Sequence, residues 1–444
     1  MGSDPAPRGA RPARAIDGQG KAAMVFRTYD DAALAFLKAY AFCVPLLYIR
    51  IGEVAVAFVD AAAPVALLLL ALSAFRMSGV QLPLYLAFFG MTVLSLFTST
   101  VANVGAGNFL LALRLLFMIL PMWIALSLTR LDDDDLREVF RIVLIGAGVG
   151  VLAGIALHSL GITVREEQQR LWLGTGSGPV YRAGGVVGES GAYGQITAIF
   201  GTLLFTAASV GVRVPLALSL FGWAIIAYAF LISSSRGGLV MLAASLLVVS
   251  MFRTRSALVL LGLALFSFGV MAGLVVWSQG DFAVYVWRSL VRLDLFNLTG
   301  ESEFGETIRF QTWNLLLDRF FDVPMLGYGY RTYSDIIGAF IDNSFLLTWF
   351  DVGPVGFVLF TLFWLALLVR LFDDTLRWGR PMSLVALALT VGFVVRMQTG
   401  GAHTSWTTAP VVYLLIGLAL RLSEGLRTGR RLDRSLAAPP SPAE

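Results

Sequence analysis

Residues 138–160 read EVFRIVLIGAGVGVLAGIALHSL, an apolar run long enough to cross a lipid bilayer as a helix. Of the 444 residues, 57% are apolar and 14% are charged, and the mean hydropathy is +0.77. These values exclude a water-soluble fold, and continuous apolar runs do not fit the alternating strands of a membrane barrel. The sequence therefore predicts an all-α polytopic membrane protein. It has about twelve candidate spans, near 33–52, 54–75, 82–103, 108–128, 138–160, 191–210, 213–233, 236–252, 256–278, 343–370, 382–400 and 405–422.

The arginines between the spans predict the orientation, because short loops rich in Lys and Arg stay in the cytoplasm. Both termini fall on this basic side, and two long loops, at 161–190 and 279–343, fall on the other. The second loop, between the ninth and tenth spans, is predicted to be partly helical. We expect a disordered basic arm at 1–30, a transmembrane domain at 31–425 that includes the periplasmic loop 279–342, and a disordered tail at 426–444. The basic residues of the cytoplasmic side are Arg8, Arg11, Arg14, Lys21, Arg27, Arg76, Arg130, Arg137, Arg141, Arg213, Arg253, Arg255, Arg370, Arg377, Arg380 and those from Arg421 to Arg434.

Several function classes find no support in the sequence. The net charge of +4 is spread over loops on both sides, and no motif that reads a nucleic-acid groove is present. Cys43 is the single cysteine, so an internal disulfide is excluded and no zinc-binding pattern exists. The chain also has no GxxxxGK[ST] motif for ATP. We therefore expect no metal, no cofactor and no nucleic-acid partner.

The outer side carries more arginine than the positive-inside rule favours. A guanidinium group is always charged and binds phosphate oxygens in a bidentate fork, so arginines that converge at the outer membrane surface suit a diphosphate headgroup. The alternative is that some of them lie among lipid headgroups or pair with an outer carboxylate, namely Glu166, Glu167, Asp318 or Asp322. We favour this second interpretation for Arg165, Arg170, Arg288 and Arg292. The full set is Arg165, Arg170, Arg182, Arg236, Arg288, Arg292, Arg309, Arg319, Arg331 and Arg396.

Arg182 and Arg236 have the more informative settings. Arg182 opens RAGGVVGESGAYGQ, a Gly-rich stretch that leads into a span, where backbone and helix start can favour an anion. Glu189 lies in the same stretch, and a charge so near a membrane boundary predicts a partner, for which Arg182 or Arg236 is the candidate. Arg236 lies in LISSSRGGLV, between two spans, with only Ser and Gly around it. A hairpin whose arginine merely touches headgroups is the alternative.

The stretch from Arg309 to Phe357 holds charged and aromatic residues just before an apolar span. Pro324 ends a predicted helix, and the Gly-rich GYGYRTY follows it. Asp342 and Asn343 stand where the next span begins. Asp342 is either the N-cap of that span or a general base that accepts a proton from a sugar hydroxyl at the membrane surface. Sugar specificity is assigned by position to the outer loop and its aromatics, among them Tyr330.

These motifs together resemble the O-antigen ligase and Wzy-type polysaccharide polymerase superfamily. SSSRGG, PMLGYGY and DNSFLLTWFDVGPVGF occur in the expected order and on the expected side, and the likeness extends from about Tyr181 to Phe357. The resemblance implies a metal-independent membrane glycosyltransferase of the GT-C type. Such an enzyme moves a glycan from undecaprenyl diphosphate onto a hydroxyl acceptor at the periplasmic face of the bacterial inner membrane, and a chain-length regulator is a potential partner.

The resemblance also implies roles for individual residues. The diphosphate-binding arginines of the family fall on Arg182 and Arg236, with Arg309 as a weaker third. Ligases of the family have His-Asn where this chain has Asp342-Asn343, a departure that favours a polymerase over a ligase acting on lipid A core. The predicted catalytic residues are then Asp342, Arg236 and Arg182. The predicted substrate-binding residues are Arg309, Glu189, Asn343, Tyr330, Arg331 and His403, the last of which is also a substitute for the base.

Two other classes of protein remain open at this stage. A transporter or flippase of lipid-linked sugars would have a similar number of spans and would recognise the same diphosphate. Against it, the sequence shows no internal repeat of two halves, and its polar residues concentrate in outer loops. A non-catalytic scaffold for envelope assembly would explain the spans but not the outward arginines.

Overall fold

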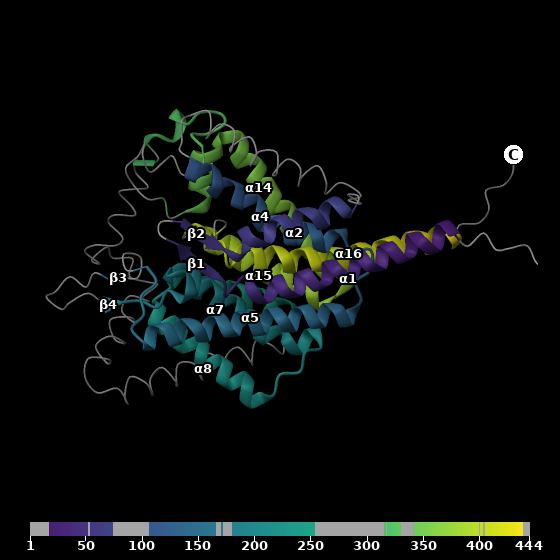
Figure 1. The fold of residues 1–444 in the computed structure, drawn as a ribbon, viewed down its shortest axis with the longest axis horizontal. Helices are drawn as coiled ribbons and strands as arrows, with labels where there is room; N and C mark the ends of the chain where they lie inside the picture. Colours follow the sequence, from purple (N-terminus) through teal and green to yellow (C-terminus); the bar gives the residue numbers. More distant parts are fainter. Residues whose placement is uncertain are drawn as a thin grey trace, which may run out of the picture.

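The computed structural model describes residues 17–51, 54–73, 106–165, 170–171, 180–253, 315–316, 318–329, 341, 343–398, 400–402 and 405–437. These parts form an elongated helical bundle with two short hairpins at one end (Figure 1). The helices are α1 (Asp17–Cys43), α2 (Phe58–Leu72), α4 (Ala106–Ser127), α5 (Asp133–Ser159), α7 (Ser190–Val210), α8 (Leu216–Ser233), α9 (Arg236–Phe252), α14 (Ser344–Trp378), α15 (Pro381–Met397) and α16 (Ala409–Ala437). The strands are β1 (Tyr48–Ile51), β2 (Val54–Ala57), β3 (Arg170–Leu171) and β4 (Val180–Tyr181), and two short 3₁₀ helices are η1 (Gly185–Val187) and η2 (Phe320–Asp322).

The helices are those of an all-α membrane protein, as the sequence predicted. Within the described residues, α5, α7, α8 and α14 are long and apolar enough to cross a membrane. Helices α2, α9 and α15 and residues Leu113–Ser127 of α4 are shorter but also apolar. The predicted spans at 82–103 and 256–278 and most of the predicted loop at 279–342 lie outside the described residues. The total of twelve spans therefore stays a prediction.

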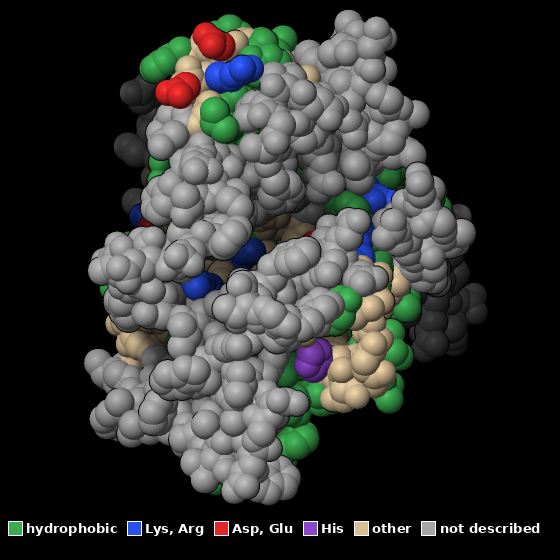
Figure 2. Space-filling model, turned by 90° about the vertical axis from the view of Figure 1, so that its left-hand side faces the viewer, with side chains coloured by type: hydrophobic (Ala, Val, Ile, Leu, Met, Phe, Trp, Pro, Cys, Tyr) green, Lys and Arg blue, Asp and Glu red, His purple; other side chains and the backbone are tan. Residues whose placement is uncertain are grey.

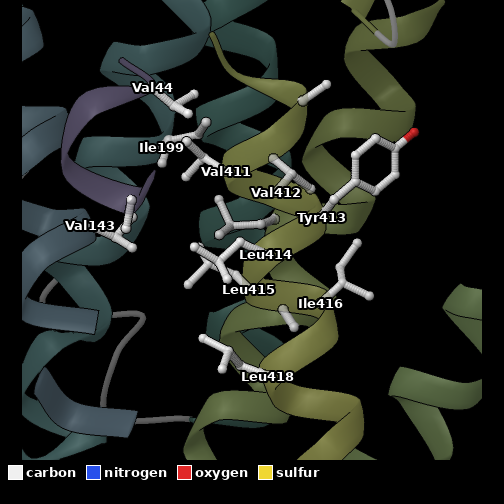
Figure 3. Packing of buried hydrophobic residues seen from close by; sticks show 14 of the residues in the cluster. Val44, Val143, Ile199, Val411, Val412, Tyr413, Leu414, Leu415, Ile416 and Leu418 are labelled. Carbon is white, nitrogen blue, oxygen red and sulfur yellow. The ribbon is translucent and has the colours of Figure 1, made fainter. Parts of the chain in front are cut away.

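The core is built around α16, which packs against α4 and α15. Its residues from Val411 to Leu418 point toward neighbouring helices, and Val44, Val143 and Ile199 approach from other elements of the bundle (Figure 3). Within the same core, Trp364 of α14 stacks on Tyr413, with ring centroids 5.8 Å apart. Apolar side chains gain little free energy by moving from lipid into such a core, because lipid tails are equally apolar. Close packing rather than the hydrophobic effect must therefore hold the helices together.

Glycines at the helix crossings allow that close packing. A Cβ at Gly238 of α9 would lie 2.5 Å from the carbonyl carbon of Gly194 in α7. A Cβ at Gly417 of α16 would lie 2.6 Å from the backbone oxygen of Met122 in α4, and one at Gly392 of α15 would lie 2.6 Å from that of Met241 in α9. Small residues let helix backbones approach and gain contact in a bilayer.

Local signals place the helix ends. Helix α5 begins after Asp132, whose side chain accepts bonds from the backbone N–H groups of Asp134 (3.1 Å) and Asp135 (2.8 Å). The helix dipole also stabilises negatively charged carboxylates at this position. Between α14 and α15, Gly379 adopts a left-handed conformation (φ 58°) and Pro381 opens the next helix, the usual stop and start signals.

The sequence was wrong about residues 44–57, which it assigned to the end of one span and the start of the next. Instead α1 ends at Cys43, and β1 and β2 form an antiparallel hairpin with Tyr48 opposite Ala57. Pro45 cannot continue a helical hydrogen-bond ladder, and the β-branched residues of YIRI and VAVA suit a hairpin. Helix α1 begins at Asp17 and α16 ends at Ala437, and the domain boundaries at residues 31 and 425 stay predictions.

The bundle has two distinct ends. We call the end with the two hairpins the loop end; it also holds the starts of α7, α9, α14 and α16 and the ends of α5, α8 and α15. We call the other end the tail end, where α1 begins and α16 finishes side by side (Figure 1). The described arginines that the sequence assigned to the outer side lie at the loop end, and those assigned to the inner side lie at the tail end.

Candidate functional site

The turn between α8 and α9 holds Arg236 at the loop end. Ser233, Ser234 and Ser235 are all buried, and Ser234 has a left-handed backbone (φ 47°) that reverses the chain. The Ser235 hydroxyl caps α9 by accepting a bond from the N–H of Gly238 at 3.3 Å. Arg236 is thus the first residue of α9. A tight, buried turn fixes its backbone at a helix N-terminus, where the local dipole favours an anion.

Arg182 is brought to the same turn by its neighbour. The N–H of Ala183 donates to the carbonyl of Ile232 in the last turn of α8 at 2.9 Å. Ala183 itself is buried at the turn. The two arginines that the sequence selected therefore come from backbone segments that are bonded to each other. From this end of the molecule, Lys and Arg side chains are visible in a hollow near the centre of the face (Figure 2).

The chain after Arg182 leads into α7 through a compact set of bonds. Residues 185–187 form η1, Gly188 turns in the left-handed region (φ 73°), and Glu189 precedes the helix as its N-cap. The N–H of Glu189 donates to the carbonyl of Gly184 at 3.0 Å. The Gly-rich stretch is therefore an ordered entry to α7 rather than an open loop.

The partner of Glu189 differs from the one predicted. Its carboxylate pairs with Arg165, with Nη1 and Oε1 2.6 Å apart, and not with Arg182 or Arg236. The same guanidinium donates from Nη2 to the Tyr48 hydroxyl at 2.7 Å. The helix that precedes Arg165, α5, packs against α7 and η1, an approach that sequence spacing does not reveal. Arg165 does pair with a carboxylate, but with Glu189, which was not among the partners expected for it.

An aromatic pair extends this network across the loop end. The rings of Tyr48 and Trp406 stack with centroids 6.3 Å apart, and the Arg114 guanidinium lies 4.4 Å from the Trp406 centroid. Arg114 in turn pairs with Asp60 at 2.6 Å. Arginine on an aromatic face is a favourable arrangement, and both arginines of this chain of contacts are neutralised by a carboxylate. We read it as structural support around the site.

Asn343 begins α14 and ties it to the end of α15. Its Oδ1 accepts bonds from the N–H groups of Phe345 (2.9 Å) and Leu346 (3.1 Å), so the N-cap is Asn343 and not Asp342, the alternative that the sequence left open. Its Nδ2 donates to the carbonyl of Gln398 at 3.1 Å. The Ser344 hydroxyl adds a bond of 2.8 Å to the carbonyl of Gly400. An asparagine is needed here because a single side chain both accepts and donates.

The PMLGYGY segment docks on a break in α14. Gly353 has non-helical backbone angles (φ 69°, ψ −178°), and Pro354 has no N–H to give to the carbonyl of Phe350. The N–H of Tyr328 bonds to that carbonyl instead (2.9 Å), and the N–H of Gly329 bonds to the carbonyl of Asp351 (2.9 Å). PMLGYGY and DNSFLLTWFDVGPVGF, which follow each other in the sequence pattern of the resemblance, are thus connected by backbone hydrogen bonds.

Arg396 was counted among the outer arginines, but no individual role was predicted for it from the sequence. It lies in the last turn of α15 and is 8% exposed. Its guanidinium packs against Gly191 of α7, Gly237 of α9 and Gly400. The available signal was an arginine at the end of an otherwise apolar span, followed by a Gly-rich turn.

Five predicted site residues, Asp342, Arg309, Tyr330, Arg331 and His403, lie outside the described residues. Their roles stay predictions. Among the residues that are described, no group of three His, Cys, Asp or Glu side chains could hold a metal ion.

The described part of the site has Arg236 at the start of α9 and Arg182 in the segment bonded to the same turn. It also has the SSSRGG and PMLGYGY segments and the α14 break. Residues 221–361 match the family model of the O-antigen ligases. No curated protein matches the chain. The matched region contains the α8–α9 turn, the PMLGYGY segment and the start of α14, whereas Arg182 and Arg396 lie outside it. Together with the apolar helices, the match supports a membrane enzyme that processes glycans, of the ligase or polymerase type.

Proposed function

We propose that the chain is a polysaccharide polymerase that transfers a glycan from undecaprenyl diphosphate onto a hydroxyl of a lipid-linked glycan acceptor. The observation that carries the proposal is the bond from Ala183 to Ile232, which holds Arg182 next to the turn that presents Arg236. Two guanidinium groups from separate segments can share the oxygens of one diphosphate. The start of α9 adds its dipole in the same place.

The reaction needs stabilisation of a leaving group. The acceptor oxygen forms a bond to the anomeric carbon of the donor glycan, while the bond from that carbon to the diphosphate oxygen breaks. The diphosphate leaves with the bonding electrons, and direct attack inverts the anomeric configuration. A preorganised donor aimed at the developing charge contributes about 3 kcal/mol in a partly dry site. Arg182 and Arg236 fill this role in the proposal, with Arg309 as a third.

The acceptor hydroxyl must lose its proton as it attacks. In the proposal Asp342 accepts it, since this residue directly precedes the N-cap of α14 in the chain. His403 is the alternative base. General-base catalysis contributes roughly a hundredfold or more. Glu189, Asn343, Tyr330 and Arg331 complete the proposed substrate-binding set, although the contacts of Glu189 with Arg165 and of Asn343 with Gln398 also give these two a structural role.

A ligase that transfers the glycan to lipid A core is the second candidate. The description of the matched family favours it. The Asp342-Asn343 pair, where ligases resembling this chain have His-Asn, favours the polymerase. Either enzyme would work at the periplasmic face of the inner membrane with both termini in the cytoplasm, because the tail end carries the arginines that the positive-inside rule retains there. A flippase could have the same orientation, but it would have no use for the proposed general base.

Reconstitution tests the proposal. The purified chain is placed in lipid with a polyprenyl-diphosphate-linked repeat unit and no nucleotide, and glycan length is followed by gel and mass analysis. A ladder of multimers with released polyprenyl diphosphate is the expected result. Transfer only after addition of lipid A core would establish the ligase. Movement of the intact donor across the bilayer without bond cleavage would establish transport instead.

The base is tested by two matched variants. Asp342→Asn keeps the size of the side chain and removes its basicity, so we expect turnover to fall about a hundredfold at constant insertion. His403→Gln should retain most of the activity. The reverse pattern would assign the proton to His403, and full activity in both variants would remove the base from the mechanism.

A further inference from the structure

Arg396 occupies an unusual position for a charged side chain in a membrane protein. It ends the apolar helix α15 and is more than nine-tenths buried. Charged groups inside a membrane domain are costly to bury, and they are retained where they contact other parts of the bundle. Its surroundings therefore indicate what it does.

Two of the surfaces around the Arg396 guanidinium are helix starts. A Cβ at Gly237, the residue after Arg236, would lie 2.6 Å from Nε and 2.7 Å from Cζ. A Cβ at Gly191, two residues after Glu189, would lie 3.2 Å from Nη2. The guanidinium thus lies close to the backbone at the beginning of both α7 and α9. These are the two helices whose entry segments carry Arg182 and Arg236.

The third surface connects to α14. A Cβ at Gly400 would collide with the guanidinium of Arg396. The carbonyl of Gly400 accepts the hydroxyl bond of Ser344, and the carbonyl of Gln398 accepts the amide bond of Asn343. The turn against which Arg396 packs is therefore the turn that holds the first residues of α14.

We infer that Arg396 is a positioning residue that sets the distance between the donor side of the site, at the starts of α7 and α9, and the acceptor side, at the start of α14. The inference rests on the proposed function, in which Arg182 and Arg236 hold the donor diphosphate and Asp342 activates the acceptor. In such a reaction, reacting atoms must be held close to about 3–3.5 Å, and a shift of 1 Å costs about a hundredfold in rate.

The shape of arginine fits this task better than that of lysine. A planar guanidinium can lie flat between glycine backbones and donate in several fixed directions, whereas an ammonium is a point charge on a flexible stem. Gly237 and Gly400 are needed for the same reason, since a side chain at either position would occupy the space of the guanidinium, and a Cβ at Gly191 would make a tight contact with it. Arg396 acts through these helix starts, and no contact with the substrate is required of it.

The test separates donor binding from turnover in the full-length chain reconstituted in lipid. For Arg396→Met we expect turnover at saturating donor and acceptor to fall at least tenfold, while the dissociation constant for the polyprenyl-diphosphate-linked glycan changes less than threefold. Arg396→Lys should recover part of the loss. Gly237→Ala keeps Arg396 but displaces it, so it should reproduce the loss of turnover. Arg377→Met, an exposed arginine at the tail end, is the matched control.

A second measurement does not depend on activity. Hydrogen exchange of the backbone should become faster at residues 190–196, 236–242 and 344–350 in Arg396→Met and in Gly237→Ala, with no change in α16. If Arg396→Met does not insert into the membrane, turnover, donor affinity and hydrogen exchange are measured on Arg396→Lys and Gly237→Ala instead.

Three results would overturn the inference. The first is wild-type turnover in an inserted Arg396→Met variant, and the second is unchanged hydrogen exchange at the three helix starts. The third is a loss of donor affinity as large as the loss of turnover, which would make Arg396 a binding group. A wild-type chain that transfers no glycan from any donor would refute the proposed function. Faster hydrogen exchange in the variants would in that case still show that Arg396 holds the three helix starts together.

Discussion

The loop end and the tail end of the bundle both carry arginines, but they hold them in different ways. At the tail end, the arginines in ion pairs stay partly exposed, as for Arg137 (44%) with Asp134 and Arg377 (69%) with Asp373. The same holds where the pair joins two helices, as for Arg380 (36%) with Asp133 at 3.5 Å. At the loop end, Arg165 reaches Glu189, 24 residues away, and Arg396 packs on three separate segments. The Arg165 side chain is only 16% exposed and Arg396 only 8%, so the loop end buries its arginines whereas the tail end leaves them near water. The loop end is therefore the end at which arginines are buried, and burial of a charged side chain is costly.

Arg236→Lys is the strongest test of that difference. The charge is kept but the bidentate fork is lost, so we expect turnover to fall about a hundredfold, equivalent to about 2.7 kcal/mol of transition-state stabilisation. The measurement is release of polyprenyl diphosphate by the reconstituted protein. Arg377→Lys at the tail end should keep wild-type turnover. If both substitutions changed turnover equally, the two ends would not differ in function and the proposed role of Arg236 would be wrong.

Gly238→Ala tests whether close backbone packing supports the loop end. The new Cβ would meet the backbone of Gly194, so we expect a loss of stability of about 1–3 kcal/mol from overpacking. The matched change at the tail end is Gly425→Ala, where nothing lies within 4 Å. There the better helix propensity of alanine should raise stability by up to about 1 kcal/mol. Thermal unfolding in detergent gives both values, and a stabilised Gly238→Ala would contradict the close crossing of α7 and α9.

Glu189 tests whether a long-range ion pair at the loop end is structural. If it only holds Arg165, then Glu189→Gln and Arg165→Gln should each lower turnover about threefold and stability by about 0.2–1 kcal/mol, and the double variant should be no worse than either. If Glu189 instead binds substrate, its substitution should cost turnover well beyond that of Arg165→Gln. A double-mutant cycle on activity and on stability distinguishes the two.

The smallest effect is expected at the tail end. Arg377→Gln removes an exposed pair within one helix, with the arginine side chain 69% exposed. Such a pair contributes about 0.3–0.5 kcal/mol, so unfolding should change by no more than that and turnover by less than twofold. A tenfold loss of turnover would show that the tail end takes part in the reaction.

The contrast also explains how much the sequence could predict. Long apolar runs between turn signals predicted α5, α7, α8, α9 and α15 within a few residues, because lipid leaves a chain few alternatives to a helix. The hairpin at 48–57 was missed, since a window of apolar residues does not distinguish strand from helix. At the site, the motifs predicted that Arg182 and Arg236 act together. The partner of Glu189 and the packing of Arg396 depend on tertiary approach, for which a single sequence has no signal.

The break in α14 has a consequence for how the protein is made. The carbonyls of Phe350 and Asp351 accept bonds from Tyr328 and Gly329, which come earlier in the chain. A carbonyl without a partner in hydrocarbon costs several kcal/mol. The segment that relieves this cost precedes α14 in the chain, so it emerges from the ribosome before the broken helix does. The broken helix is therefore stable in hydrocarbon only with PMLGYGY docked on it, so the two must fold together.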